Sequence, residues 1–305
     1  MAATCDAAYS DYIRQILSYL PDVWNPEKFF VPDLLTRIPI NYPVRAFNVT
    51  VLDFSVTFDL VLGALGLGLA GLVIGKYCYE RRVGAAWFLL LMFLFYSLNK
   101  WEMLTNGTGW VHFLAFACFY YHYLVLDRME AGQGKRGDGL RLKVLPFVIT
   151  LCIAGPYCAV YSGVLFLAYG FLAVKAYRKT KKWDRAYFYY GLCVLLPLLI
   201  YMVSSSLAVY EHTGAYTGPM LPVLLEQPGL FVKFFIKSFG GMVMEKETLE
   251  YGVNMGYFPY AVVYAMGFAV MGGYLAALWL NFRFRLYERT ILPLILVMAG
   301  GMNHV

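Results

Sequence analysis

The hydrophobic positions of this chain fall into long uninterrupted blocks rather than into a pattern that alternates with polar positions. Several blocks approach the roughly 20 apolar residues that a helix needs to cross a bilayer of about 30 Å. Helices are expected because lipid offers no hydrogen-bond partner to the exposed backbone of an open sheet. We therefore predict an all-α, polytopic transmembrane helix bundle with about eight membrane segments, at residues 55–75, 83–98, 110–126, 144–155, 158–174, 186–209, 258–280 and 291–305.

Glycine and proline refine this pattern at two kinds of position. Residues 155–157, Gly-Pro-Tyr, leave two interpretations of the fourth and fifth segments: two short helices, or one broken element. Glycines inside the first and seventh segments predict close helix packing, because they let two backbones approach each other. They are Gly63, Gly66, Gly68, Gly71, Gly75, Gly267, Gly272 and Gly273.

Two further segments have apolar residues at helical spacing but carry charges as well. They are DYIRQILSYL at 11–20 and LLEQPGLFVKFFIKSF at 224–239. We predict an amphipathic helix in each, lying on the membrane surface or on the bundle. In the second, Lys233 and Lys237 are four residues apart. They either reach from the interface into water or contact the phosphate groups of a lipid substrate.

The distribution of charge predicts which connections share a side of the membrane. Seventeen of the 25 Lys and Arg residues lie in connections 76–82, 127–143, 175–185 and 281–289, whereas most acidic residues lie elsewhere. The positive-inside rule places these four connections in the cytoplasm. The chain then divides into an outer-face region, 1–53, and a transmembrane bundle, 54–305, whose loop 210–257 also faces outward.

Composition agrees with a membrane protein and excludes several other classes. Hydrophobic residues make up 60% of the chain and charged residues 14%, against about half and about a quarter in soluble domains. Basic loops beside anionic lipid account for the net charge of +6, so membrane lipid is the expected partner and nucleic acid is not. The six cysteines show no CxxC spacing, and HExxH, EF-hand and GxxxxGK[ST] patterns are absent. We expect no metal site and no cofactor, with a divalent cation requirement left open.

The ends of the sequence suggest a piece of a longer protein. Residues 1–53 are predicted to lie outside, yet no signal peptide or apolar helix precedes them. The last segment has about fifteen residues, which span only about 22 Å as a helix. Our hypothesis is that at least one helix is missing before residue 1.

Ionisable residues are concentrated on the predicted outer face rather than in the middle of the membrane segments. Asp59 lies inside the first segment, and His112 and His122 are placed near helix ends. Because a charge inside lipid is costly, Asp59 is expected to pair with Arg37, Arg45 or Lys100. This distribution favours binding or a reaction at the outer leaflet over transport through the core.

The connection SLNKWEMLTNGTGW, 97–110, allows two interpretations. In one, Trp101 is an interfacial anchor and Glu102 a solvated turn residue. In the other, Glu102 is partly desolvated at the mouth of the bundle and acts as a base or positions a substrate hydroxyl, with His112 orienting it. Asp53, just before the first segment, is predicted to cap the N-terminus of that helix.

Four stretches resemble a group of bacterial polytopic proteins related to GT-C-type membrane glycosyltransferases, many of them uncharacterised. The stretches are FFVPDLLTRIPI, FDLVLGALGLGL, LFYSLNKWEMLTNGTGWVHFLAF and GPYCAVYSGVLFLAYG, which begin at residues 29, 58, 94 and 155. The resemblance covers about residues 10–175. It implies a protein of the bacterial cytoplasmic (inner) membrane that transfers a sugar from a polyprenyl-phosphate carrier to an acceptor outside.

The resemblance also implies roles for residues of the outer face. A carboxylate would deprotonate the acceptor hydroxyl, and an Arg or Lys would neutralise the phosphate leaving group. The base candidates are Asp11, Asp22, Asp33 and Asp53, with Glu102 as a supporting acid. The substrate and phosphate candidates are Arg37, Arg45, Lys100, Trp101, His112, Lys233 and Lys237. The acidic residue that follows the first helix in those proteins would precede residue 1 or fall near 6–11.

The sequence is also compatible with two other functions. A flippase or transporter of lipid-linked sugars would need a continuous polar groove through the bundle. A non-catalytic integral membrane protein of an envelope assembly would need none of the candidate residues for chemistry.

The predicted topology is testable by epitope tags. A tag in the 175–185 connection should be protected from protease in intact cells, and a tag in the 210–257 loop should be cleaved, because the first connection is basic and the second is acidic. Protease accessibility before and after lysis measures both. Finding either tag on the other side would contradict the assignment.

Overall fold

The computed structural model describes residues 22–30, 37–97, 101–206, 224–244 and 246–302, together with residues 13 and 20. Over these residues the regular structure is helical and contains no strand, which confirms the all-α class. The chain forms two compact units, Met1–Tyr210 and Glu211–Val305. The predicted amphipathic helix at 11–20 lies almost wholly outside the described residues.

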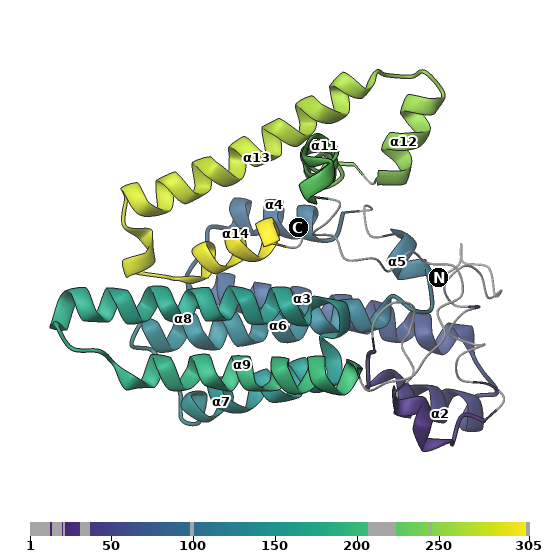
Figure 1. The fold of residues 1–305 in the computed structure, drawn as a ribbon, viewed down its shortest axis with the longest axis horizontal. Helices are drawn as coiled ribbons and strands as arrows, with labels where there is room; N and C mark the ends of the chain where they lie inside the picture. Colours follow the sequence, from purple (N-terminus) through teal and green to yellow (C-terminus); the bar gives the residue numbers. More distant parts are fainter. Residues whose placement is uncertain are drawn as a thin grey trace. The chain divides into compact units, whose positions relative to one another are not determined.

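The first unit contains the helices that run side by side in Figure 1, with α2 at one end of them. Helix α3 packs on α6, α7 packs on α6 and α9, and α8 packs on α9. The elements are η1 Pro26–Phe30, α2 Asn41–Val51, α3 Val56–Glu80, α4 Ala85–Phe95, α5 Trp101–Thr105, α6 Trp110–Glu130, α7 Asp138–Val148, η3 Ile149–Ile153, η4 Gly155–Tyr157, α8 Cys158–Thr180 and α9 Arg185–Ser206.

The second unit is built on one long helix. Helix α11 packs against α13, and α13 is followed by a short turn and by α14. Gly267 of α13 lies against the backbone of Ile236 in α11, which confirms its predicted packing role, whereas Gly272 and Gly273 face open space. The elements are α11 Pro228–Gly240, α12 Lys246–Asn254, α13 Tyr260–Arg283, η5 Leu286–Glu288 and α14 Leu292–Met302.

Every predicted membrane segment contains helix, but not every helix has the length of a span. Among the described residues, four helical stretches are long and apolar enough to cross a membrane: Val56–Glu80, Gly155–Thr180, Arg185–Ser206 and Tyr260–Arg283. Ala85–Phe95 and Leu292–Met302 are apolar but shorter. Four helices of spanning length among the described residues are typical of a membrane-embedded protein, and the count of eight spans stays a prediction.

The fourth and fifth segments are two helices, the first of the two interpretations. Pro146 lies inside α7 and has no N–H to donate, and a π-helical turn, η3, follows it directly. Gly155 then adopts a φ of +47°, and a Cβ on it would lie 2.6 Å from the side chain of Ile38. The amide of Ile40 donates to the carbonyl of Cys152 at 3.0 Å. Contacts from residues 38–40 therefore stabilise the turn between the two helices.

Helices α3 and α6 approach each other closely at one glycine. A Cβ on Gly66 would lie 3.1 Å from Cβ of Phe113 and 3.2 Å from the backbone nitrogen of Leu114. A Cβ on Gly68, two residues further along α3, would meet nothing within 4 Å. The predicted packing role is thus confirmed for Gly66 and not for Gly68.

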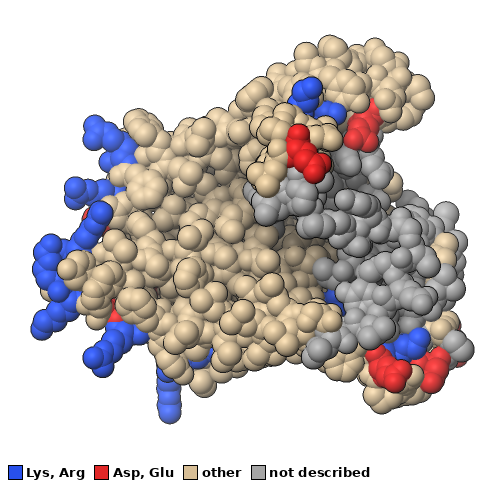
Figure 2. Space-filling view, in the orientation of Figure 1, with Lys and Arg blue, Asp and Glu red and all other residues tan. Residues whose placement is uncertain are grey.

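One end of the first unit carries most of its Lys and Arg side chains, as Figure 2 shows in blue. Three predicted basic connections, 76–82, 127–143 and 175–185, contribute exposed residues there, and the opposite end of the unit shows acidic side chains. The exposed basic residues of these connections are Lys76, Arg82, Lys135, Arg136, Lys143, Arg178, Lys179, Lys181, Lys182 and Arg185. The charge asymmetry expected from the positive-inside rule therefore exists along this unit.

Buried ion pairs fix the helix ends beneath these exposed charges. Asp138 is fully buried and receives Nε and Nη2 of Arg128 at 2.8 Å each, Nη1 of Arg141 at 2.7 Å and the amide of Lys135 at 2.8 Å. The hydrogen bonds from Arg128 hold the pKa of Asp138 well below its usual range. Arg81 pairs with Asp127, which ties α3 to α6. The connection between α6 and α7 is thereby rigid.

Replacing Gly66 by Leu should destabilise the protein, because the side chain would enter the contact between α3 and α6. Overpacking of this kind costs about 1–3 kcal/mol. Thermal unfolding of the detergent-purified protein measures the effect, with Gly68→Leu as the matched control that should unfold near the wild-type temperature. Equal destabilisation by both changes would contradict a role for this contact, because Leu is the better helix former and a Cβ on Gly68 meets nothing within 4 Å.

Candidate functional site

A buried ion pair lies where the chain enters its first long helix. Arg45 in α2 and Asp59 in the first turn of α3 have fully buried side chains. Nη1 of Arg45 donates to Oδ2 of Asp59 at 2.7 Å, and Nη2 donates to Oδ1 in a second, parallel contact. This bidentate geometry is the strongest arrangement that an Arg and a carboxylate can form. Of the three partners expected for Asp59, the structure therefore selects Arg45.

Asn48 completes this cluster and defines the start of α3. Its side-chain amide donates to Asp59 Oδ2 and to the carbonyl of Ser55, both at 3.1 Å, and its Oδ1 accepts the Ser55 amide at 2.8 Å. Ser55 then accepts the amide of Phe58 and is the N-cap of α3. The prediction that Asp53 caps this helix is wrong. Asp53 is exposed and has a φ of +48°, in the tight turn that precedes the cap.

Arg37 has a different environment at the same end of the unit. Its Nη2 donates to the hydroxyl of Ser204 at 2.6 Å, and its carbonyl accepts the hydroxyl of Tyr201 at 2.6 Å, so it binds the C-terminal part of α9. The guanidinium carbon lies 5.3 Å from the ring centroid of Phe30, 5.4 Å from Tyr201 and 6.0 Å from Phe29. Aromatic rings from η1 and α9 thus surround a guanidinium that is 5% exposed.

The contrast between the two arginines is chemical. Arg45 is neutralised by Asp59, whereas the described residues offer Arg37 only a hydroxyl and aromatic faces. Nε of Arg37 and the nearby hydroxyl of Ser205 are also buried without a hydrogen-bond partner in the described part of the chain. Each of the three cation–π contacts contributes about 0.5–2 kcal/mol, and together they offset part of the several kcal/mol that burial of an ion costs. A bidentate anion such as phosphate would complement this guanidinium.

Within the 97–110 connection, residues 101–105 form a short helix rather than an open turn. Trp101 begins α5 and is half exposed, and Glu102 lies in the same helix, although its side chain is outside the described residues. The polar turn that follows is closed by Asn106, whose Oδ1 accepts the amide and the hydroxyl of Thr108 at 3.1 and 3.0 Å. The choice between the two interpretations of Glu102 therefore stays open.

His112 lies one helix further on, near the start of α6. Its ring contacts that of Tyr157 edge to face, with centroids 5.4 Å apart. Because the side chain of Glu102 lies outside the described residues, the orienting role of His112 stays a prediction.

The other candidates fall in three places. Asp11, Asp33 and Lys100 lie outside the described residues. Asp22 is exposed just before η1. Lys233 and Lys237 lie on α11 in the second unit, where they line a pocket.

Sequence reasoning missed a polar group inside the helix bundle. His122 was expected near a helix end, but it is fully buried in the interior of α6. Its Nδ1 lies 2.5 Å from the hydroxyl of Tyr161, and its Nε2 lies 3.5 Å from the hydroxyl of Tyr169, two turns along α8. The spacing of the two tyrosines, eight residues apart on one helix face, was the available signal. The two tyrosine hydroxyls give the buried ring nitrogens of His122 hydrogen-bond partners and connect α6 to α8.

The described residues show no set of three His, Cys, Asp or Glu side chains that could hold a metal ion. The candidate site in the first unit is therefore Arg37 with its aromatic and hydroxyl neighbours, supported by the neutralised pair Arg45–Asp59.

The structural role of Arg45 predicts a specific mutational pattern. Arg45→Met should cost about 3–5 kcal/mol because Asp59 would remain as an uncompensated buried charge, and Arg45→Met/Asp59→Leu should recover most of that loss. The exposed pair of Lys135 and Glu80, at 3.1 Å, is the matched control, for which Lys135→Met should cost about 1 kcal/mol or less. Thermal unfolding in detergent measures all three. A double variant as unstable as the single one would contradict a pair role.

Three comparisons with known proteins found no protein similar to this chain. A scan against protein-family models found no match. Searches of curated proteins and of solved structures found no match either.

Proposed function

We propose that this chain belongs to a bacterial cytoplasmic-membrane protein that transfers a sugar from a polyprenyl-phosphate carrier to an acceptor at the outer face, in the manner of GT-C-type glycosyltransferases. The observation that carries the proposal is Arg37, a buried guanidinium whose described neighbours are neutral. Such a group is suited to the phosphate that leaves when the glycosidic bond to the carrier breaks.

Charge distribution supports the same location. Arg37 contacts Phe30 of η1 and Ser204 near the C-terminus of α9, whereas the N-terminus of α9 follows the basic connection 175–185. If that connection is cytoplasmic, as the positive-inside rule predicts, Arg37 lies at the outer membrane surface. A carrier phosphate is held at that level, because its chain is in the bilayer and its headgroup is in the interface.

The proposed reaction divides the work between an acid–base residue and the arginine. A carboxylate takes the proton of the acceptor hydroxyl, the hydroxyl oxygen bonds to the anomeric carbon, and the carrier phosphate leaves with the electrons of the broken bond. Arg37 would hold the phosphate oxygens through two parallel hydrogen bonds. Asp53, exposed in the turn before α3, and the untested Asp11, Asp33 and Glu102 are the base candidates.

Arg37 is preferred to Arg45 as the phosphate ligand for an energetic reason. A phosphate that bound Arg45 would have to displace Asp59 and leave that carboxylate buried beside a second anion. Among the described residues, a phosphate that bound Arg37 would displace only the hydroxyl of Ser204. The pair Arg45–Asp59 then acts by holding α2 and α3 in place beneath the site.

The test is transfer from synthetic polyprenyl-phosphate-linked glucose, galactose and mannose by membranes that contain the full chain. Arg37→Ala should lower turnover about a hundredfold, as loss of a charge-stabilising donor does in other enzymes. Arg37→Lys should retain part of the activity, because it keeps the charge and loses the bidentate geometry. Arg178→Ala, at an exposed site on the basic end, is the matched control and should be fully active.

Thermal unfolding of each variant separates loss of function from loss of fold. Wild-type protein that releases polyprenyl phosphate from none of the donors would overturn the proposal. Activity of Arg37→Ala equal to that of Arg178→Ala would do the same.

A further inference from the structure

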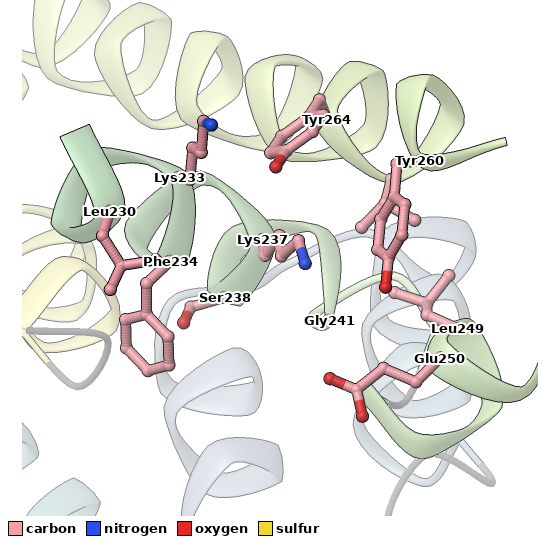
Figure 3. A pocket seen from close by; sticks show the side chains of 11 residues that line it. Leu230, Lys233, Phe234, Lys237, Ser238, Gly241, Leu249, Glu250, Tyr260 and Tyr264 are labelled. Atoms are coloured by element: carbon pink, nitrogen blue, oxygen red, sulfur yellow. The ribbon is translucent and has the colours of Figure 1, made fainter. Parts of the chain in front are cut away.

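The second unit contains a pocket of about 470 Å³ between helices α11, α12 and α13 (Figure 3). Its apolar wall includes Leu230 and Phe234 of α11 and Leu249 of α12. Its polar groups are the two lysines of α11, the hydroxyls of Ser238, Tyr260 and Tyr264, and the carboxylate of Glu250. A pocket with one apolar side and several polar groups fits an amphiphilic ligand.

The position of the pocket along α13 sets its depth in the membrane. Tyr260 and Tyr264 lie in the first two turns of α13, a helix of 24 residues that is apolar enough to span a bilayer. Only 11% of the apolar window of this helix is buried inside the protein, so most of its surface is available to lipid. The end of a spanning helix lies at the level of the headgroups, where tyrosines concentrate. The pocket therefore opens at headgroup depth.

The charges in the pocket favour an anion. Lys233 and Lys237 are four residues apart on α11, and residues at this spacing have Cβ atoms about 5–6 Å apart on one helix face. Neither ammonium forms an ion pair within the described part of the unit. Nζ of Lys237 instead lies 4.2 Å from the ring centroid of Tyr260, which orients the cation at the pocket wall. The lining has two ammonium groups and one carboxylate, that of Glu250, so a headgroup with a phosphate would balance the excess positive charge whereas a neutral headgroup would not.

We infer that this pocket binds the phosphate of a membrane lipid, with Lys233 and Lys237 on the phosphate and the hydrocarbon chain along Leu230 and Phe234. The lysines thus bind one defined headgroup, in addition to any general attraction to the membrane surface. Two lipids supply this chemistry: a glycerophospholipid of the bilayer, and a polyprenyl-phosphate carrier. Only the second rests on the proposed function, and neither depends on Arg37.

The test is native mass spectrometry of the detergent-purified full chain with three probes. Dioleoyl phosphatidate and a short-chain polyprenyl phosphate carry the phosphate, and dioleoylglycerol has the same acyl chains as the first without it. Wild-type protein should bind at least one phosphate lipid with a Kd at least tenfold lower than that for dioleoylglycerol. The phosphate lipid that binds identifies the source.

Amino-acid substitutions test whether the lipid binds in this pocket. Lys233→Gln/Lys237→Gln should raise the Kd for the phosphate lipid at least tenfold and leave weak binding of dioleoylglycerol unchanged. Lys179→Gln/Lys182→Gln removes the same charge from an exposed connection of the first unit and should have no effect. Lys233→Arg/Lys237→Arg should bind like the wild type because it keeps both charges, and unchanged binding of dioleoylglycerol by the glutamine variant excludes loss of folding as the cause.

Equal weakening in the two glutamine variants would overturn the inference, and so would binding of dioleoylglycerol as tight as that of phosphatidate. Arg37→Ala should keep its lipid binding in this assay. Loss of sugar transfer with retained binding, or the reverse, therefore separates failure of this inference from failure of the proposed function.

Discussion

The first unit depends on one buried ion pair, Arg45 with Asp59. A carboxylate in the first turn of an apolar helix is tolerated only if a cation and further donors accompany it into the low-dielectric interior. Arg45 supplies the cation and Asn48 supplies the donor, and both come from α2. Asn48 also holds Ser55, which begins α3. The pair therefore determines where the chain enters its first long helix and how α2 lies beside it.

Asp138 and His122 follow the same rule, that a buried polar group is accompanied by partners, so a group that departs from this rule is informative. Asp138 is surrounded by donors from Arg128, Arg141 and Lys135, and His122 lies between two tyrosine hydroxyls. Buried polar groups with partners of this kind stabilise a helix bundle and have no need of a ligand. Arg37 departs from the rule among the described residues, because its neighbours are a hydroxyl and aromatic rings. Function is proposed at this arginine for that reason.

We propose the same chemistry, binding of a lipid phosphate, for both units. In the first unit the guanidinium of Arg37 is buried beside the C-terminal part of α9, and in the second two ammonium groups line a pocket. The two sites differ in the kind of contact that they can form with a phosphate. Arg37 can form two directed hydrogen bonds to a leaving phosphate, whereas the lysines are point charges that suit binding without chemistry. A transferase that also holds a lipid would combine both properties.

The sequence by itself determined the all-helical class, the apolar segments, the segregation of basic connections and the close packing at Gly66 and Gly267, because each depends on local composition or spacing. It left three partners for Asp59, since a choice among groups 14 or more residues apart requires the folded chain. It also assigned the N-cap of α3 to Asp53, whereas the structure has Ser55 there, held by Asn48. Only the tertiary structure neutralised Arg45, left Arg37 among aromatic rings and brought His122 between Tyr161 and Tyr169. The physical reason is that burial and pairing are properties of neighbours in space, which residue order alone does not specify.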